Sequence, residues 1–249
     1  MNYFNELVQG FRNLGIEAGD MILMHSSLKS LGVKEVTPEI AISALLHVIG
    51  ESGTLILPCL SYRDVTEKNP VFSVKETPCC VGAIPEYFRT RKNTIRSVHP
   101  THSVCATGAL AYEITKDHIK DTTPVGLNSP FTLLPKYNGK ILMLGCGLKP
   151  NTSMHGVEEI AGAPYCLKDN DTHYKITLEN NIVIESVHKR HNFYGFIQRY
   201  DRITEILNND EINCGKVLQA NCHLIDSKAM WQNGITAIKE NPYRFVDKS

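Results

Sequence analysis

An amide, an imidazole and a carboxylate recur at helical spacing in the second half of the chain. His155 follows Asn151 by four residues and precedes Glu158 by three, so a helix that begins near Asn151 carries all three side chains on one face. An imidazole takes up a proton near neutral pH, and a carboxylate can orient the ring or stabilise the imidazolium. The spacing therefore predicts a general base. It also fits a simpler interpretation, in which Asn151 caps the helix and His155 is an ordinary surface histidine.

A second group of chemically active side chains lies in residues 96–104, where His99 and His102 precede a strand-like run. With His155 as a third ligand they could bind a metal ion. However, Pro100 interrupts any helix there, and the segment contains no Cys or Asp, so we expect no metal. Two other interpretations remain for this segment. It is either a ligand-binding loop with hydroxyl and backbone N–H donors, or a turn whose buried polar groups bond to the backbone.

The third group is residues 25–32, His-Ser-Ser-Leu-Lys-Ser-Leu-Gly, which leave an apolar strand-like run. Their hydroxyl and backbone N–H groups could hold a phosphate, although a plain surface loop fits as well. The segment matches neither the Walker loop nor the dinucleotide-binding glycine pattern. The chain also lacks the Gly-x-Ser-x-Gly turn of hydrolases, which argues against an acyl-enzyme serine.

The elements that must position these groups alternate between helix and strand. We expect helices at 3–14, 37–50, 82–91, 107–116, 152–160, 194–207 and 226–240, and strands at 21–24, 54–57, 103–106, 140–144, 174–178, 182–187 and 216–224. This order predicts an α/β/α layered fold with a central mostly parallel or mixed sheet, plus an antiparallel hairpin with its turn at residues 179–181. No repeat, low-complexity tract or linker divides the chain, so residues 1–249 are interpreted as one domain.

The composition excludes several classes of protein. Lys plus Arg and Asp plus Glu are 26 each, and this balance argues against a nucleic-acid partner. No apolar run approaches the roughly 18 residues of a membrane span, and the N-terminus has no secretory pattern, so we expect no membrane partner. Eight cysteines are scattered without a Cys-x-x-Cys pair. They indicate reduced thiols and a cytoplasmic location.

Several of these segments, taken together and in order, resemble the aminoglycoside 3-N-acetyltransferase family, which has the antibiotic N-acetyltransferase fold. The resemblance runs from about residue 3 to about residue 245. It is carried by residues 24–28 with Gly32, 53–58, 99–104 with Gly108, 128–130, 139–145, and Asn151 and Thr152 with His155 and Glu158. One departure is Cys59, where the family often has Thr after the proline of the second strand.

The resemblance implies an acetyl-CoA cosubstrate and an amino-sugar acceptor. It implies that His155 is the base, held by Glu158 and Asn151. It implies that the CoA pyrophosphate is held by Ser26, Ser27, Leu28, His102, Ser103 and Val104. The chemistry agrees, because an amine that is protonated at neutral pH must lose a proton before it attacks a thioester directly.

The sequence determines the acceptor less closely than the cosubstrate and the base. Residues 61–78 and 169–191 do not follow the resemblance, and we expect acceptor-binding parts there, with 169–191 as the variable segment. The cationic and imidazole side chains of 169–191 favour an anionic acceptor, such as a nucleotide-linked (dTDP-type) 3-amino-deoxy sugar. The alternative is an aminoglycoside 3-N-acetyltransferase that confers antibiotic resistance. Other classes remain open: a metal hydrolase using His99, His102 and His155, or an inactive CoA-binding protein. The oligomeric state, a homo-oligomer included, is not determined.

Overall fold

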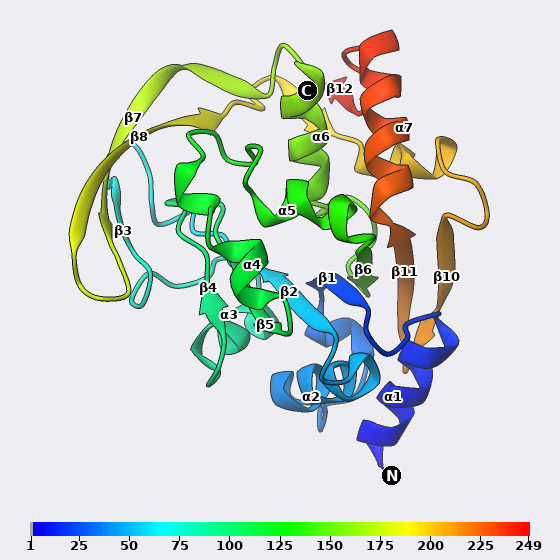
Figure 1. Ribbon diagram of the computed structural model, residues 1–249. Helices are drawn as coiled ribbons and strands as arrows, with labels where there is room; N and C mark the ends of the chain where they lie inside the picture. Colours follow the sequence, from blue (N-terminus) through cyan, green and yellow to red (C-terminus); the bar gives the residue numbers. More distant parts are fainter. Residues whose placement is uncertain (1) are drawn as a thin grey trace.

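A computed structural model describes residues 2–249, and within them a seven-stranded mixed sheet forms the centre of the molecule (Figure 1). Its order is β10 (Ile212–Val217), β11 (Ala220–Asp226), β6 (Lys140–Leu144), β1 (Met21–Ser26), β2 (Thr54–Pro58), β5 (Val104–Gly108) and β4 (Ile95–Arg96). Strand β1 pairs in parallel with both β2 and β6, and the outer strands pair antiparallel. The predicted fold class is confirmed.

Both faces of this sheet are apolar, and each is covered by helices. In β1, Ile22 and Met24 pack into one core with helices α1 (Tyr3–Asn13), α2 (Pro38–Ile49) and α3 (Ala83–Thr90). The alternate residues Met21 and Leu23 pack into the second core, on the opposite face. The helices on that face are α4 (Ala111–Thr115), α5 (Pro130–Leu133), α6 (Ser153–Ala161) and α7 (Ser227–Glu240). The central strands are therefore buried on both sides, as parallel strands require.

The helix ends follow local capping chemistry. The side chain of Thr37 accepts a hydrogen bond from the Ile40 backbone N–H, and Pro38 occupies the first turn of α2. The side chain of Asp226 caps α7 in the same way. Helix α6 ends at Gly162, whose φ of +76° lies in the left-handed region that favours glycine. These boundaries lie within a few residues of those expected from the sequence.

Two smaller sheets occur in the described part of the chain. The first contains the long hairpin of β7 (Leu167–Thr177) and β8 (Val183–His191), with β3 (Val71–Ser73) parallel to β7. This hairpin projects from the main body as an arm (Figure 1). Phe72, Tyr174 and Ile176 belong to its small core. The second pairs β9 (Phe196–Gln198) with β12 (Val246–Lys248) near the C-terminus. The expected hairpin is therefore confirmed, but it is longer than expected.

Three expectations about the elements are wrong. Residues 194–207 are not one helix but β9 followed by the 3₁₀ helix η4 (Tyr200–Glu205), because β9 pairs with the distant C-terminal strand. The run 216–224 belongs to two strands that reverse at Leu218, whose φ is +51°. Residues 61–78, for which no helix or strand is expected, contain β3. In each case a partner or a turn that the local pattern does not reveal decides the structure.

Two further features of the described residues concern the cysteines and the lengths of the helices. The eight cysteines carry free thiols within residues 2–249, and four of them are buried. Among the same residues, no helix combines the length and the apolar character needed to cross a lipid bilayer.

Candidate active site

A cavity of about 510 Å³ opens at the edge of the sheet where the parallel strands end. Strands β1, β2 and β6 run in the same direction, so Ser26, Pro58 and Cys146 all reach this edge and line the cavity. Strand β5 runs the opposite way, so the segment that precedes it brings His102 to the same place. Ligands of open α/β sheets bind at this edge, so the topology itself indicates the site.

Helix α6 starts beside the cavity and presents the predicted base. His155 lines the cavity, whereas Glu158, one turn further along, is fully buried. Their direct separation, between His155 Nδ1 and Glu158 Oε2, is 3.7 Å. The i, i+3 spacing therefore places the two side chains on one face of α6, with the imidazole toward the cavity and the carboxylate behind it.

The hydroxyl of Tyr200 bridges this pair. Tyr200 Oη lies 2.7 Å from His155 Nδ1 and donates to Glu158 Oε2, also at 2.7 Å. Because the phenol gives its proton to the carboxylate, its oxygen accepts from Nδ1–H, and the free lone pair of His155 is on Nε2. Tyr165 Oη donates to the other carboxylate oxygen at 2.9 Å. Burial, and then the charge of Glu158, raises the pKa of Tyr200 well above its usual value, so the phenol keeps its proton.

Asn151 is placed differently from the sequence interpretation. Helix α6 begins at Ser153, so Asn151 lies before it and not on the face of His155. Its Oδ1 accepts from the Ser153 backbone N–H at 3.2 Å, and its Nδ2 contacts Met230 Sδ at 3.2 Å. Asn151 therefore shapes the entrance to the helix, and a catalytic role for it stays a prediction.

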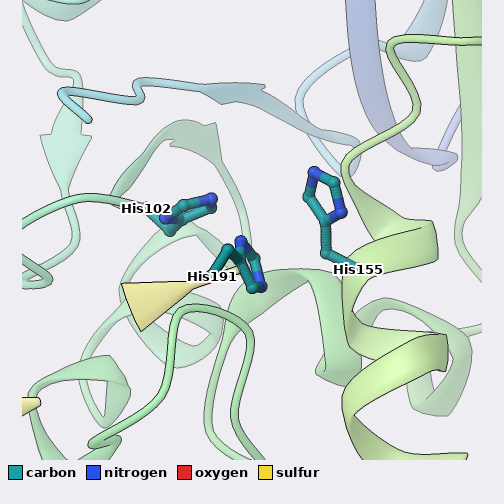
Figure 2. A group of neighbouring side chains, drawn as sticks. All are labelled: His102, His155 and His191. Carbon is teal, nitrogen blue, oxygen red and sulfur yellow. The ribbon is translucent and has the colours of Figure 1, made fainter. Parts of the chain in front are cut away.

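Two further imidazoles stand beside His155 (Figure 2). The ring of His191, at the end of β8, lies 4.6 Å from that of His155 and 4.7 Å from that of His102, measured between centroids. His191 Nε2 is 2.7 Å from Glu159 Oε1. Burial, and then the nearby His155, lowers the pKa of His191 well below its usual value. Burial, and then His191, does the same for His102, so both rings are neutral at pH 7.

The residues implied for CoA binding differ in whether they line the cavity. Ser26 and His102 line the cavity, and the buried Ser26 hydroxyl has no hydrogen-bond partner among the described residues. Ser27 is close by, but its backbone N–H donates to the Leu144 carbonyl and its hydroxyl accepts from another serine. Ser26 and His102 are therefore the two residues of this set that are free to meet a ligand in the cavity.

The remaining three implied residues do not line the cavity. Leu28 packs against the core beneath α1 and α2. Ser103 is fully buried and its hydroxyl donates to the Cys59 carbonyl, while the backbone N–H of the buried Val104 donates to a serine hydroxyl. The Ser103 hydroxyl and the Val104 backbone N–H thus already have partners within the protein, and contact of either residue with CoA stays a prediction.

Among the described residues, the histidines that converge differ from the set His99, His102 and His155 that the metal alternative considered. His99 is buried, and its Nδ1 accepts from the backbone N–H groups of Thr101 and His102. The three histidines whose ring nitrogens converge are instead His102, His155 and His191, within 4.8 Å of one another. His99 thus shapes the turn that carries His102, as the buried-turn interpretation predicted.

The sequence interpretation missed Tyr200, Tyr165, Glu159 and His191 as members of the site. Tyr200 lies in residues 194–207, where the pattern predicts a helix, and His191 ends the variable segment 169–191. Neither has a local signal, since each comes from an element far from residue 155 in the chain. Glu159 is adjacent to Glu158, and burial raises its pKa to about 7.

Comparison with known proteins identifies the family of this chain. A family model described as aminoglycoside 3-N-acetyltransferase matches residues 23–239. The chain therefore belongs to the aminoglycoside 3-N-acetyltransferase family, and the resemblance inferred from the sequence is confirmed. Aminoglycoside N(3)-acetyltransferase VII of Streptomyces paromomycinus is 32% identical over 175 residues, and type IV of a Salmonella species is 34% identical over 160 residues. Each alignment covers 64% of this chain and only 60% of the relative.

Solved structures are similar over nearly the whole chain. The apoenzyme of aminoglycoside acetyltransferase AAC(3)-IVa has a TM-score of 0.79 at 26% identity and covers 97% of this chain and 90% of its own. The structure titled AAC-IIIb binary with CoASH has a TM-score of 0.82 at 25% identity, and the match covers 99% of this chain and 98% of that one. AAC-VIa bound to sisomicin has a TM-score of 0.79 at 25% identity, and the match covers 95% of this chain and 97% of that one.

Proposed function

We propose that this chain transfers the acetyl group of acetyl-CoA to an amino group of an aminoglycoside, with His155 as the general base. The observation that carries the proposal is the chain of contacts from His155 through Tyr200 to Glu158, beside a cavity. This arrangement gives an imidazole with a free Nε2 and a buried counter-charge behind it. Such a group removes the proton that keeps an amine from acting as a nucleophile.

The chemical step is a direct transfer. As the amine nitrogen attacks the thioester carbonyl, a C–N bond forms, the C–S bond breaks and CoA leaves as a thiolate. The proton of the amine passes to His155 Nε2. Positive charge on the ring is then stabilised by Glu158 through the Tyr200 hydroxyl. No covalent intermediate on the protein is needed, which is consistent with the absence of an activated serine in the sequence.

The names of the relatives and of the solved neighbours favour an aminoglycoside over the nucleotide-linked sugar that the sequence interpretation preferred. One observation still favours an anionic acceptor as the second candidate. Among residues 2–249, the side chains that line the cavity include Lys149 and Arg190 but no Asp or Glu. A polycationic drug gains from carboxylates around it, so a cavity without them suits it less well.

A panel of acceptors tests both candidates. Release of CoA thiol is followed with kanamycin- and gentamicin-type drugs and with nucleotide-linked 3-amino sugars. We expect kcat/KM to be higher for a drug than for any nucleotide sugar. A higher kcat/KM for a nucleotide sugar would make that sugar the preferred acceptor. If neither kind of acceptor were turned over, the proposed acetyl transfer itself would be contradicted.

The role of His155 has its own test. We expect His155→Ala to lose roughly 10²-fold or more in kcat, since a positioned general base contributes about that much. His47→Ala removes an exposed histidine of α2 that does not line the cavity, and it should leave the rate unchanged. A His155→Ala variant that keeps the wild-type rate would remove the general base from the proposal.

A further inference from the structure

Three imidazoles from three separate elements converge on one space beside the cavity. His102 comes from the loop before β5, His155 from α6 and His191 from the end of β8 (Figure 2). One ring nitrogen of each lies within 4.8 Å of those of the other two. General-base catalysis needs only one imidazole, so the two others require a separate explanation.

Each ring is held by an oxygen on one of its nitrogens. The pairs are His102 Nδ1 with Thr101 Oγ1 at 2.9 Å, His155 Nδ1 with Tyr200 Oη at 2.7 Å, and His191 Nε2 with Glu159 Oε1 at 2.7 Å. The opposite nitrogen of each ring has no hydrogen bond within residues 2–249. Histidines that bind metals show this pattern, because an oxygen on one nitrogen fixes the ring while the other nitrogen binds the ion.

We propose that His102, His155 and His191 bind one divalent transition-metal ion of the zinc type, and that the ion blocks acetyl transfer. A zinc ion binds imidazole at about 2.0–2.1 Å and tetrahedrally, so two ligand nitrogens are then roughly 3.4 Å apart. Metal binding therefore requires the nitrogens to approach from their present separations of up to 4.8 Å. All three histidines line the cavity, so a water molecule there would complete the coordination.

The inhibitory consequence rests on the function proposed above. The only lone pair of His155 that is free to take a proton is on Nε2, and this is the atom that the metal occupies. Glu158 and Glu159, behind two of the rings, offset the charge of the ion. Lys149 and Arg190 also line the cavity, and their positive charges weaken the binding of the ion. The site therefore makes the enzyme sensitive to free zinc.

Binding is tested without activity. Protein without a polyhistidine tag, freed of metal by a chelator, is titrated with Co²⁺, and its visible absorption is followed. We expect one ion per chain, displaced by Zn²⁺, and at least a tenfold weaker affinity in His191→Asn. His173→Asn, at an exposed position of β7, is the matched control and should bind as the wild type does. No saturable binding, or equal binding by both variants, would overturn the site.

A second measurement needs no variant and so does not depend on whether His191→Asn folds. X-ray absorption of the wild-type protein with one equivalent of Zn²⁺ should report three imidazole ligands. Two or fewer would overturn the proposal.

In the acetyl-transfer assay, zinc should inhibit the wild type reversibly, with recovery on addition of EDTA. A wild-type rate that is unaffected by a full equivalent of bound zinc would overturn the inhibition. If no acceptor is turned over, the proposed function fails, while the Co²⁺ titration still decides whether the metal site exists.

Discussion

The hydroxyl of Tyr200 determines which nitrogen of His155 is free to act as a base. We predict that Tyr200→Phe lowers kcat roughly tenfold or more, because the ring keeps its packing while the link from His155 Nδ1 to Glu158 is lost. The KM for acetyl-CoA should change little. Initial rates at saturating acetyl-CoA and saturating acceptor measure this directly.

Tyr165→Phe is the matched control for this variant. It also removes a hydroxyl that donates to the buried Glu158, but it leaves the contact with His155 intact. Each variant should lose about 1–3 kcal/mol in the free energy of unfolding, because a buried carboxylate loses a donor. Equal losses of rate in the two variants would show that Tyr200 acts only by supporting Glu158.

At the scale of elements, the close approach of α6 and α7 sets the position of His155. A Cβ atom added at Gly156 would lie 2.5 Å from Trp231 Cη2 and 2.6 Å from Val125 Cγ1. Alanine gains about 1 kcal/mol in helix propensity over glycine, but overpacking of this kind costs about 1–3 kcal/mol. We therefore predict that Gly156→Ala lowers the free energy of unfolding, measured by urea titration, and also lowers kcat.

Gly10→Ala, in the middle of α1, provides the comparison. The nearest atom to its added Cβ would be Val217 Cγ1, at 3.2 Å. This change should be close to neutral, because helix propensity and a tight contact nearly cancel. If both variants changed stability equally, the packing of α6 on α7 would not be the cause.

At the scale of the whole molecule, buried neutral histidines make stability depend on pH. Burial lowers the pKa of His25 and of His118 to about 3, and that of His188 to about 4, all from 6.5. Below pH 6.5 the unfolded chain binds protons at these residues and the folded chain does not, so stability is complete above that pH and falls as pH decreases.

Each of these three histidines contributes up to about 1.4 kcal/mol per pH unit to that loss. We predict that the urea midpoint decreases steeply from pH 6.5 to pH 4.5 and is flat from pH 7 to pH 8. His173→Gln, at an exposed position, should leave the profile unchanged. A midpoint that is constant from pH 7 to pH 5 would contradict the prediction.

Much of the fold follows from patterns a few residues long. The Thr37 cap with Pro38, the apolar runs of β1 and β6, and the i, i+3 spacing of His155 and Glu158 are all properties of neighbouring residues. They could be predicted because hydrogen bonds and side-chain directions within a helix or strand depend on local geometry. The order of strands and helices likewise indicated a layered fold, and the sheet edge where the cavity lies.

The tertiary structure decided what lies opposite those residues. Only the folded chain brings Tyr200 to His155 and Glu158, or His191 to His102. The sequence determined where a base stands on its helix, together with the layered fold that carries it. The structure decided which hydroxyl bonds to one nitrogen of the base and leaves the other free, and which imidazoles lie around it. These are contacts between distant segments, and they depend on how the whole sheet and its hairpin pack.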